Sequence, residues 1–311
     1  MRTLRVATRR SPLAQAQTGL VVRALQAVHP ELTVEVVTFE TTGDRQQGEL
    51  AQAGGKGLFT LELEEALRAG EVHVAVHSAK DLPARIDPAF VITAGLMRAD
   101  ACDTLVTRDG VGWRDLPAGA TVGTGSLRRK VQLETLRPDV TVVPIRGNVQ
   151  TRLGRVMDRG DMDAVVLAQA GLARSGLAET YAGHLVPFTP AEMLPAAGQG
   201  ILAIETLVDD KETGRLLAAI ADAPTLRALQ AERVVVSALD ADCRSCLAVY
   251  ASPVDGGWLV RAMAADSAGF ERVYSEIQTP DAVEAGTMAA EELRAQGALR
   301  LLSGDGSPGV A

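Results

Sequence analysis

The stretch Leu4–Ala27, LRVATRRSPLAQAQTGLVVRALQA, sets the pattern for the first half of the chain. It begins with the strand LRVAT and passes through a loop, Arg9–Pro12, into a helix. Ser11 suits the N-cap position, because its hydroxyl can accept a hydrogen bond from a free backbone N–H, and Pro12 suits the first helical position. The stretch therefore predicts a strand, a short loop and a helix.

The same order of elements continues along the first region and occurs again from Thr121. The first region adds the strand LTVEVVTF, the loop AGGKG, a helix closing on Gly70 and the strand VHVAV. The second region has strands at 121–124, 140–145 and 163–168, with helices at 127–136 and 149–160. Each region reads β-α-β-α-β with short loops, which predicts two mostly parallel sheets covered by helices. A Ser or Thr precedes the first helix of each, so two such units facing each other would form a cleft with anion sites on both walls.

The last third of the chain has a different pattern. The segment FTPAEMLPAAGQGILAIE, after Pro187, is expected to cross back to the first domain. The helix LRALQAERVVVSAL then precedes three short strands, LAVYAS, WLVRAMAA and FERVYSEIQ, which predict an antiparallel sheet, and a final helix precedes a frayed tail, SGDGSPGVA. We predict three domains: residues 1–98 with 196–214, residues 99–195, and residues 215–311. The first two are α/β and the third is a small α+β domain.

Composition argues against several classes of partner. The 311 residues carry a net charge of −8 and only 3% aromatic residues, which disfavours a broad nucleic-acid-binding face. No apolar run is long enough to span a membrane, and the N-terminus lacks the apolar segment of a signal peptide. We therefore expect a cytoplasmic protein with reduced cysteines. Arginines account for 27 of its 31 basic residues, and their guanidiniums can pair bidentately with the carboxylates of a small polyanion.

Two of the three cysteines lie in the stretch Asp240–Tyr250, DADCRSCLAVY. A metal site, a disulfide switch, buried structural thiols and a covalent attachment point are all open explanations. The Cys-x-x-Cys spacing occurs once, with no histidine nearby, so a closed zinc site lacks ligands and we expect no metal. Burial as a small hydrophobic residue is the favoured role for Cys246. His77, at a strand exit, is interpreted as structural.

Basic side chains recur where predicted strands end and helices begin. Arg128 and Arg129 occupy the first turn of a helix that starts after Ser126, where a cation opposes the helix dipole and costs up to ~1 kcal/mol unless an anion compensates. Arg9 lies at a similar junction. Three further arginines lie at or near such junctions: Arg146, Arg152 and Arg174. The placement indicates an anion-binding cleft, against the alternative of scattered solvated charge.

Lys80 and Asp81 follow the strand VHVAV in the loop HSAKDLP. Ligands of α/β proteins bind at the carboxyl ends of parallel strands, and a surface ion pair is the competing explanation.

Seven motifs in order resemble the porphobilinogen deaminases, also called hydroxymethylbilane synthases. They are RVATRRSPLAQAQ, GGKGLF, VHSAKDLP, GTGSLRR, IRGNVQTRL, LPAAGQG and DCRSCLAVYA. The resemblance implies two periplasmic-binding-protein-like doubly wound domains and a small α+β domain. It also implies a monomer that adds four porphobilinogen molecules, with loss of ammonia, to a two-ring dipyrromethane primer held by a thioether. Hydrolysis then releases the linear tetrapyrrole.

The resemblance also implies the site residues. Cys243, seven positions before Tyr250, matches the cofactor-bearing cysteine, although Cys246 stands where relatives often have Pro. Asp81 matches the catalytic carboxylate, which would accept hydrogen bonds from pyrrole N–H groups and stabilise developing positive charge. Cofactor contacts are expected from Ser11, Lys80, Asp81, Thr124, Ser126, Arg128, Arg129 and Arg146. Substrate contacts are expected from Arg9, Arg152, Arg174, Phe59 and Gln199.

Two other classes of protein stay open from the residues alone. A two-lobed anion-binding module without catalysis would share the scaffold but gives no reason for Asp81 or the cysteine loop. A redox or metal protein would instead use Cys243 and Cys246.

Overall fold

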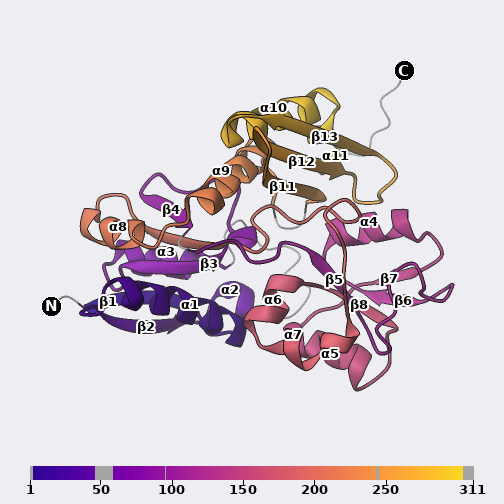
Figure 1. Ribbon diagram of the computed structural model, residues 1–311, viewed down its shortest axis with the longest axis horizontal. Coiled ribbons are helices and arrows are strands. Elements are labelled where there is room, and N and C mark those ends of the chain that lie inside the picture. The colour runs from indigo at the N-terminus through magenta and orange to yellow at the C-terminus, as the bar shows by residue number, and fades with distance from the viewer. Residues whose placement is uncertain (1–2, 46–58, 95, 243–244, 304–311) are drawn as a thin grey trace. The chain divides into compact units, whose positions relative to one another are not determined.

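The computed structural model describes residues 3–45, 59–94, 96–242 and 245–303 and contains three β-sheets (Figure 1). The helices within these ranges are α1 (Pro12–Val28), α2 (Thr42–Arg45), α3 (Leu61–Arg68), α4 (Leu127–Leu136), α5 (Val149–Met157), α6 (Gln169–Arg174), α7 (Leu177–Thr180), α8 (Lys211–Ala218), α9 (Ala223–Ala238), α10 (Ala282–Ala295) and α11 (Ala298–Ser303), with short 3-10 helices η2 (Ala79–Asp81) and η3 (Ala182–His184). The predicted AGGKG loop and most of the C-terminal tail lie outside the described residues.

The first sheet has the strand order β2-β1-β3-β10-β4. Its strands are β1 (Thr3–Arg9), β2 (Thr33–Phe39), β3 (Val74–Ser78), β4 (Phe90–Ala94) and β10 (Leu202–Leu207). The strands β2, β1 and β3 are parallel, whereas β10 runs antiparallel between β3 and β4. The segment after Pro187 thus returns to the first sheet and occupies a position inside it.

The second sheet repeats this arrangement in the order β7-β6-β8-β5-β9. Its strands are β5 (Asp103–Thr107), β6 (Thr121–Gly123), β7 (Thr141–Val143), β8 (Ala164–Ala168) and β9 (Leu185–Pro187). Here β5 is the inserted antiparallel strand, between β8 and β9. Each α/β sheet is therefore built on a parallel β-α-β-α-β unit, as predicted. Each also holds one antiparallel strand, whose direction the sequence patterns did not indicate, although the return of the segment after Pro187 was expected.

The third sheet is antiparallel, in the order β11-β12-β13. Its strands β11 (Leu247–Val254), β12 (Gly257–Ala265) and β13 (Arg272–Thr279) match the three predicted strands. The helix α10 lies along this sheet (Figure 1). Gly286 of α10 also approaches α9 closely, since a Cβ there would lie 2.4 Å from the backbone oxygen of Ala231. Two α/β sheets and a separate antiparallel sheet confirm the predicted fold class.

The chain forms two compact units. Unit 1 comprises Met1–Ala99 and Ile201–Leu229, and unit 2 comprises Asp100–Gly200 and Gln230–Ala311. The third sheet groups with the second because Val131 of α4 packs against Cys246 and Met263. The division into three domains, with the boundaries given above, stays a prediction.

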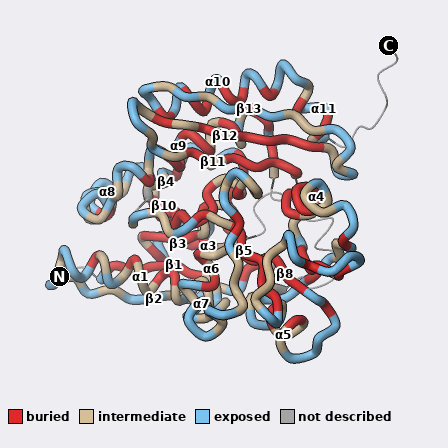
Figure 2. The backbone as a smooth tube through the Cα atoms, turned by 45° about the vertical axis from the view of Figure 1, so that its right-hand side comes forward, coloured by how far each residue is buried: buried red, intermediate tan, exposed pale blue. Residues whose placement is uncertain are grey.

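Buried side chains follow the periodicities expected of these elements. In α1 the buried positions Gln17, Val21 and Leu25 are four residues apart, so one face of the helix meets the first sheet. The strand β3 is buried at four successive positions, as expected for a parallel strand covered on both faces. Figure 2 shows the same burial along β3 and β12. Within the described ranges, every helix is too short or too polar to cross a lipid bilayer.

Candidate active site with arginines around a buried aspartate

Lys80 and Asp81 lie in η2, directly after the carboxyl end of β3. The turn is held by a hydrogen bond from the Ala79 N–H to the Ile201 carbonyl, 3.0 Å, next to β10. Both side chains are half-buried. Within the described part of the chain, the Asp81 carboxylate has no hydrogen-bond or ion-pair partner, so its oxygens can accept from a ligand.

The loop between β1 and α1 lies at the same edge of the first sheet. Ser11 caps α1, where its hydroxyl accepts from the Ala14 N–H at 3.3 Å, and Pro12 is the first helical residue, as predicted. Ser78, at the end of β3, donates to the Gln17 side chain of α1 at 3.1 Å. The structure thus brings together the β1–α1 loop and the catalytic loop predicted from sequence.

Arg9 already has an acidic partner in unit 1. Its Nε lies 3.2 Å from Asp44 Oδ2, and its guanidinium stacks 4.1 Å above the centre of the Phe59 ring. Burial raises the pKa of Asp44, but hydrogen bonds from Arg9 and Thr41 outweigh it and leave that pKa below its usual value. Gly43 leaves room for Phe59, because a Cβ there would lie 2.1 Å from the ring. Arg9 and Phe59 therefore form one fixed cluster.

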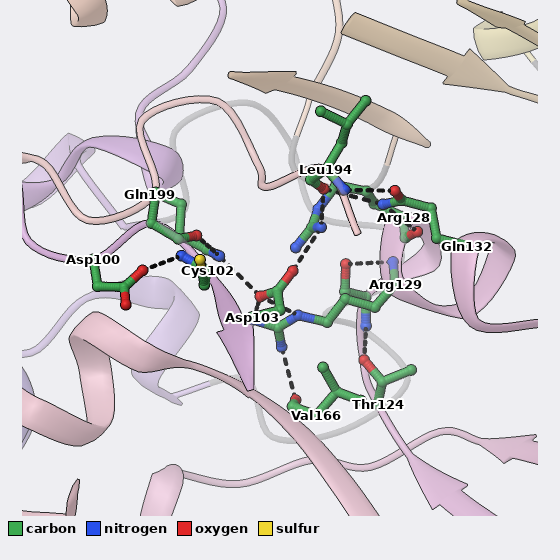
Figure 3. A network of polar contacts seen from close by, with 12 residues as sticks. Asp100, Cys102, Asp103, Thr124, Arg128, Arg129, Gln132, Val166, Leu194 and Gln199 are labelled. Atoms are coloured by element: carbon green, nitrogen blue, oxygen red, sulfur yellow. Dashed lines mark hydrogen bonds and ion pairs between the residues drawn. The ribbon is translucent and has the colours of Figure 1, made fainter. Parts of the chain in front are cut away.

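The centre of the second site is Asp103, the first residue of β5, which is fully buried (Figure 3). Arg128 Nη1 lies 2.7 Å from Asp103 Oδ2, and Arg129 Nη2 lies 2.8 Å from Oδ1. Burial raises the pKa of Asp103, but the charges of both arginines and hydrogen bonds from Arg128 and Gln199 hold it far below its usual range. Asp103 is therefore ionised at neutral pH and bound to two cations.

This pairing changes the interpretation of the arginines at the start of α4. Cations in the first turn of a helix oppose the helix dipole, and the sequence alone predicts that the anion of a ligand compensates them. The structure supplies Asp103, an internal carboxylate 26 positions before Arg129 in sequence. One negative charge facing two positive charges still leaves a buried cationic excess, so the pairing does not remove the capacity to bind an anion.

Gln199 belongs to the same network. Its side-chain Nε2 donates to the Ala101 carbonyl at 2.7 Å and to Asp103 Oδ1 at 2.8 Å, and the residue is 1% exposed. Sequence reasoning placed Gln199 at a chain crossing between domains, and it does lie next to the boundary between Gly200 and Ile201. It missed the contact with Asp103.

Thr124 and Ser126 organise the start of α4. The Ser126 hydroxyl accepts from the Arg129 N–H at 3.4 Å as the N-cap, and the Thr124 hydroxyl accepts from the Ser126 N–H at 3.1 Å. Both predicted hydroxyls therefore bind backbone donors of their own loop.

Three other predicted arginines of unit 2, Arg146, Arg152 and Arg174, lack acidic partners among the described residues. Arg152 Nε donates to the Gly147 carbonyl at 2.8 Å, and burial together with the charge of Arg129 lowers the pKa of Arg152. Arg174 Nη2 donates to the Gly200 carbonyl at 2.6 Å, and burial lowers its pKa to about 10. Arg146 is exposed, after β7. Half-buried guanidiniums that meet only carbonyl oxygens can bind an anionic ligand.

Of the two cysteines in the C-terminal stretch, the structure describes Cys246 but not Cys243. Cys246 is 2% exposed and packs against Val131 and Met263, which confirms its predicted burial. Burial raises the pKa of Cys246 to about 11, so its thiol is a poor nucleophile at neutral pH. Cys243 lies outside the described residues. The described residues contain no group of three or more acidic, histidine or cysteine side chains placed to hold a metal ion.

Sequence reasoning missed Asp103 and Glu205, both fully buried. Glu205 of β10 shares a hydrogen bond with His77 Nε2 at 3.0 Å, next to the turn of Lys80 and Asp81. His77 is thus a buried partner of a carboxylate, in line with its structural interpretation. The signal for Asp103 was present: an aspartate leads the apolar run TLV, and two arginines at a helix start needed an anion.

Comparisons with known proteins show the family of this chain. A family model described as porphobilinogen deaminase, dipyrromethane cofactor binding domain, matches residues 4–215. The porphobilinogen deaminase of Streptococcus sanguinis is 39% identical over 301 residues, covering 96% of this chain and 98% of that protein. Those of Sorangium cellulosum and Roseiflexus sp. are 46% and 43% identical, over 86% and 97% of this chain and 88% and 99% of theirs. The chain therefore belongs to the porphobilinogen deaminase family.

Proposed function

We propose that this chain is a transferase that condenses four molecules of porphobilinogen head to tail. Four molecules of ammonia are lost, and water then releases the linear tetrapyrrole hydroxymethylbilane. Each porphobilinogen brings an acetate and a propionate, so the growing product gains two carboxylates with every addition. The enzyme must therefore offer more positive than negative charge around the bound chain.

The observation that carries the proposal is the local excess of buried and half-buried guanidiniums over acidic partners at the predicted anion-binding positions of unit 2. Among the described residues, Asp103 is the one carboxylate paired with Arg128 and Arg129, while Arg152 and Arg174 meet only carbonyl oxygens. Keeping buried cations together is costly without an anion, and the carboxylates of ligand and product would offset that cost.

The same residues fit a dipyrromethane cofactor, which carries carboxylates of the same kind. Such a cofactor supplies the nucleophilic pyrrole carbon to which the first substrate is joined. We propose Arg128, Arg129, Arg146, Thr124 and Ser126 in unit 2, with Ser11 and Lys80 in unit 1, as the residues that hold it. Arg9, Arg152, Arg174, Phe59 and Gln199 are proposed to contact substrate, Arg9 and Phe59 as one preformed cluster.

Asp81 is proposed as the catalytic carboxylate. Its oxygens have no partner in the described chain and can accept hydrogen bonds from pyrrole N–H groups. Loss of ammonia leaves positive charge on the substrate, and a carboxylate held on a fixed turn stabilises that charge without reorganising. The same carboxylate can take up the proton that leaves the attacking pyrrole carbon.

Cys243 is proposed as the covalent anchor. The raised pKa of Cys246 supports this choice, because a thiol that stays protonated at neutral pH does not compete for the electrophilic substrate carbon. We also propose a cytoplasmic monomer with no nucleic-acid or membrane partner and with three domains, divided as in the sequence analysis.

The test is an intact mass under denaturing conditions for the wild type, Cys243→Ser and Cys246→Ser. We expect a two-pyrrole excess in the wild type and in Cys246→Ser, and its loss in Cys243→Ser alone. Asp81→Asn should keep the excess and lose most turnover. A wild type with the bare-chain mass, no gain on incubation with porphobilinogen and no release of ammonia would favour an anion-binding module instead.

A further inference from the structure

The position of Asp103 between two arginines suggests a part in ligand binding beyond fold stability. We infer that Asp103 is a positioning residue that orients Arg128, so that the Nε–Nη2 edge of its guanidinium receives a ligand carboxylate. The inference rests on the proposed function and assigns different tasks to two neighbouring arginines that sequence reasoning treated alike.

Arg129 is held on all sides by the protein. Its Nε donates to Asp103 Oδ1 at 2.9 Å, its Nη2 lies 2.8 Å from the same oxygen, and its Nη1 donates to the Val166 carbonyl at 2.9 Å. With every guanidinium nitrogen engaged and the side chain 7% exposed, Arg129 acts as a fixed base for the carboxylate of Asp103.

Arg128 is held at one nitrogen only. Its Nη1 lies 2.7 Å from Asp103 Oδ2 and donates to the Leu194 carbonyl at 2.5 Å. Its Nε and Nη2 donate no hydrogen bond within the described part of the chain (Figure 3). These two nitrogens form the edge that binds a carboxylate through two hydrogen bonds. The protein fixes the third nitrogen and leaves both donors of this edge without an acceptor among the described residues, in a side chain that is 4% exposed.

Arg128 lies on α4, the helix that packs against the start of the third sheet, where Val131 contacts Cys246. Burial raises the pKa of Cys246, and the charge of Arg128 is close enough to act against that rise. Arg128 is therefore close to the residue that follows the proposed anchor, Cys243, by three positions in sequence.

Gln199 fixes Asp103 in turn. By donating to both the Ala101 carbonyl and Asp103 Oδ1, it ties the carboxylate to the backbone before β5. Asp103 thus meets donors from α4 and from the segment before β10, and its two oxygens have little freedom to rotate. Rigid support of this kind is what a binding side chain requires for a reproducible geometry.

The experiment compares Asp103→Asn with Asp139→Asn. Asp139 is the matched control, since it pairs with Arg137 at the other end of α4, 2.6 Å between Nη2 and Oδ2, and contacts neither Arg128 nor Arg129. Each variant is incubated with porphobilinogen and weighed intact, and its KM and kcat are then measured. A purely structural loss lowers the active fraction and hence the apparent kcat, whereas a misplaced Arg128 weakens ligand binding.

We expect Asp103→Asn either to lose the two-pyrrole mass or to raise KM by about tenfold, with Asp139→Asn unchanged in both. Full cofactor mass and a wild-type KM in Asp103→Asn would overturn the inference and leave the proposed function intact. A wild type without adduct or turnover would refute both. If Asp103→Asn does not fold, Asp103→Glu keeps the charge but displaces the carboxylate, and should raise KM about threefold; an unchanged KM would again overturn the inference.

Discussion

The buried pair of His77 and Glu205 allows a sharp test of the energetics next to the turn of Lys80 and Asp81. Their side chains are 3% and 0% exposed and lie 3.0 Å apart, and Glu205 Oε1 has no hydrogen-bond partner among the described residues. Burial and the charge of Glu205 also raise the pKa of Glu64 on the neighbouring helix. The substitution His77→Leu would leave two carboxylates in this part of unit 1 without the imidazole.

Removing one partner of a buried pair costs about 3–5 kcal/mol. His77→Leu leaves Glu205 fully buried without its partner, so we expect a loss of stability in this range.

Urea unfolding of the wild type and His77→Leu at pH 7 measures this loss. With a slope of about 2–3 kcal/mol/M, the midpoint of the transition that reports unit 1 should fall by more than about 1 M. The double variant His77→Leu, Glu205→Leu removes the buried charge and should regain most of the stability. A loss below about 1 kcal/mol, or a double variant no more stable than His77→Leu, would refute the reasoning.

Three further predictions concern other residues. Gly286→Ala should lower the free energy of unfolding by about 1–3 kcal/mol, because the new Cβ meets the Ala231 backbone. Gly214→Ala in α8 should raise it by about 0.5–1 kcal/mol, because a Cβ there has nothing within 4 Å and alanine favours the helix; chemical denaturation measures both changes. The pKa of Asp103 is depressed in the folded protein, so Asp103 contributes to the free energy of unfolding above its ordinary pKa of 3.8, and this contribution is lost as the pH falls below that value. In Asp103→Asn the free energy of unfolding should therefore fall less steeply with acidification below about pH 4 than in the wild type, and an equally steep fall would contradict this. Arg152→Met removes a half-buried cation repelled by Arg129, so its melting temperature should stay the same or rise while turnover falls; a clear drop in melting temperature would count against this.

Local signals predicted much of the fold. The helix from Leu127 to Leu136 begins after its Ser126 cap and ends before Pro138, and the start at Ser11–Pro12 behaves in the same way. These boundaries depend on residues within one turn of each other, which a sequence displays directly. The antiparallel strands β5 and β10 could not be predicted in this way, since their partners are set by chain crossings many residues away.

The candidate site shows the same limit. Residue type and position identified Arg128 and Arg129 as cations in need of an anion, but not Asp103 as the residue that provides it. A single aspartate ahead of an apolar run resembles a loop residue, and only the tertiary fold buries it beside α4. The partner of Arg9 could not be predicted for the same reason, because Asp44 lies 35 positions away in sequence.

The placement of β10 inside the first sheet has a consequence for synthesis on the ribosome. The strands β3 and β4 do not pair with each other but with β10, and residues 95–201 separate β4 from it. At about 5–20 residues per second, the nascent chain carries two unpaired strand edges for roughly 5–20 s before β10 emerges. The second sheet needs only residues 103–187, so it can close first. The part of the chain made first is therefore completed after the second sheet, and a chain that stops before residue 202 would expose those edges to aggregation.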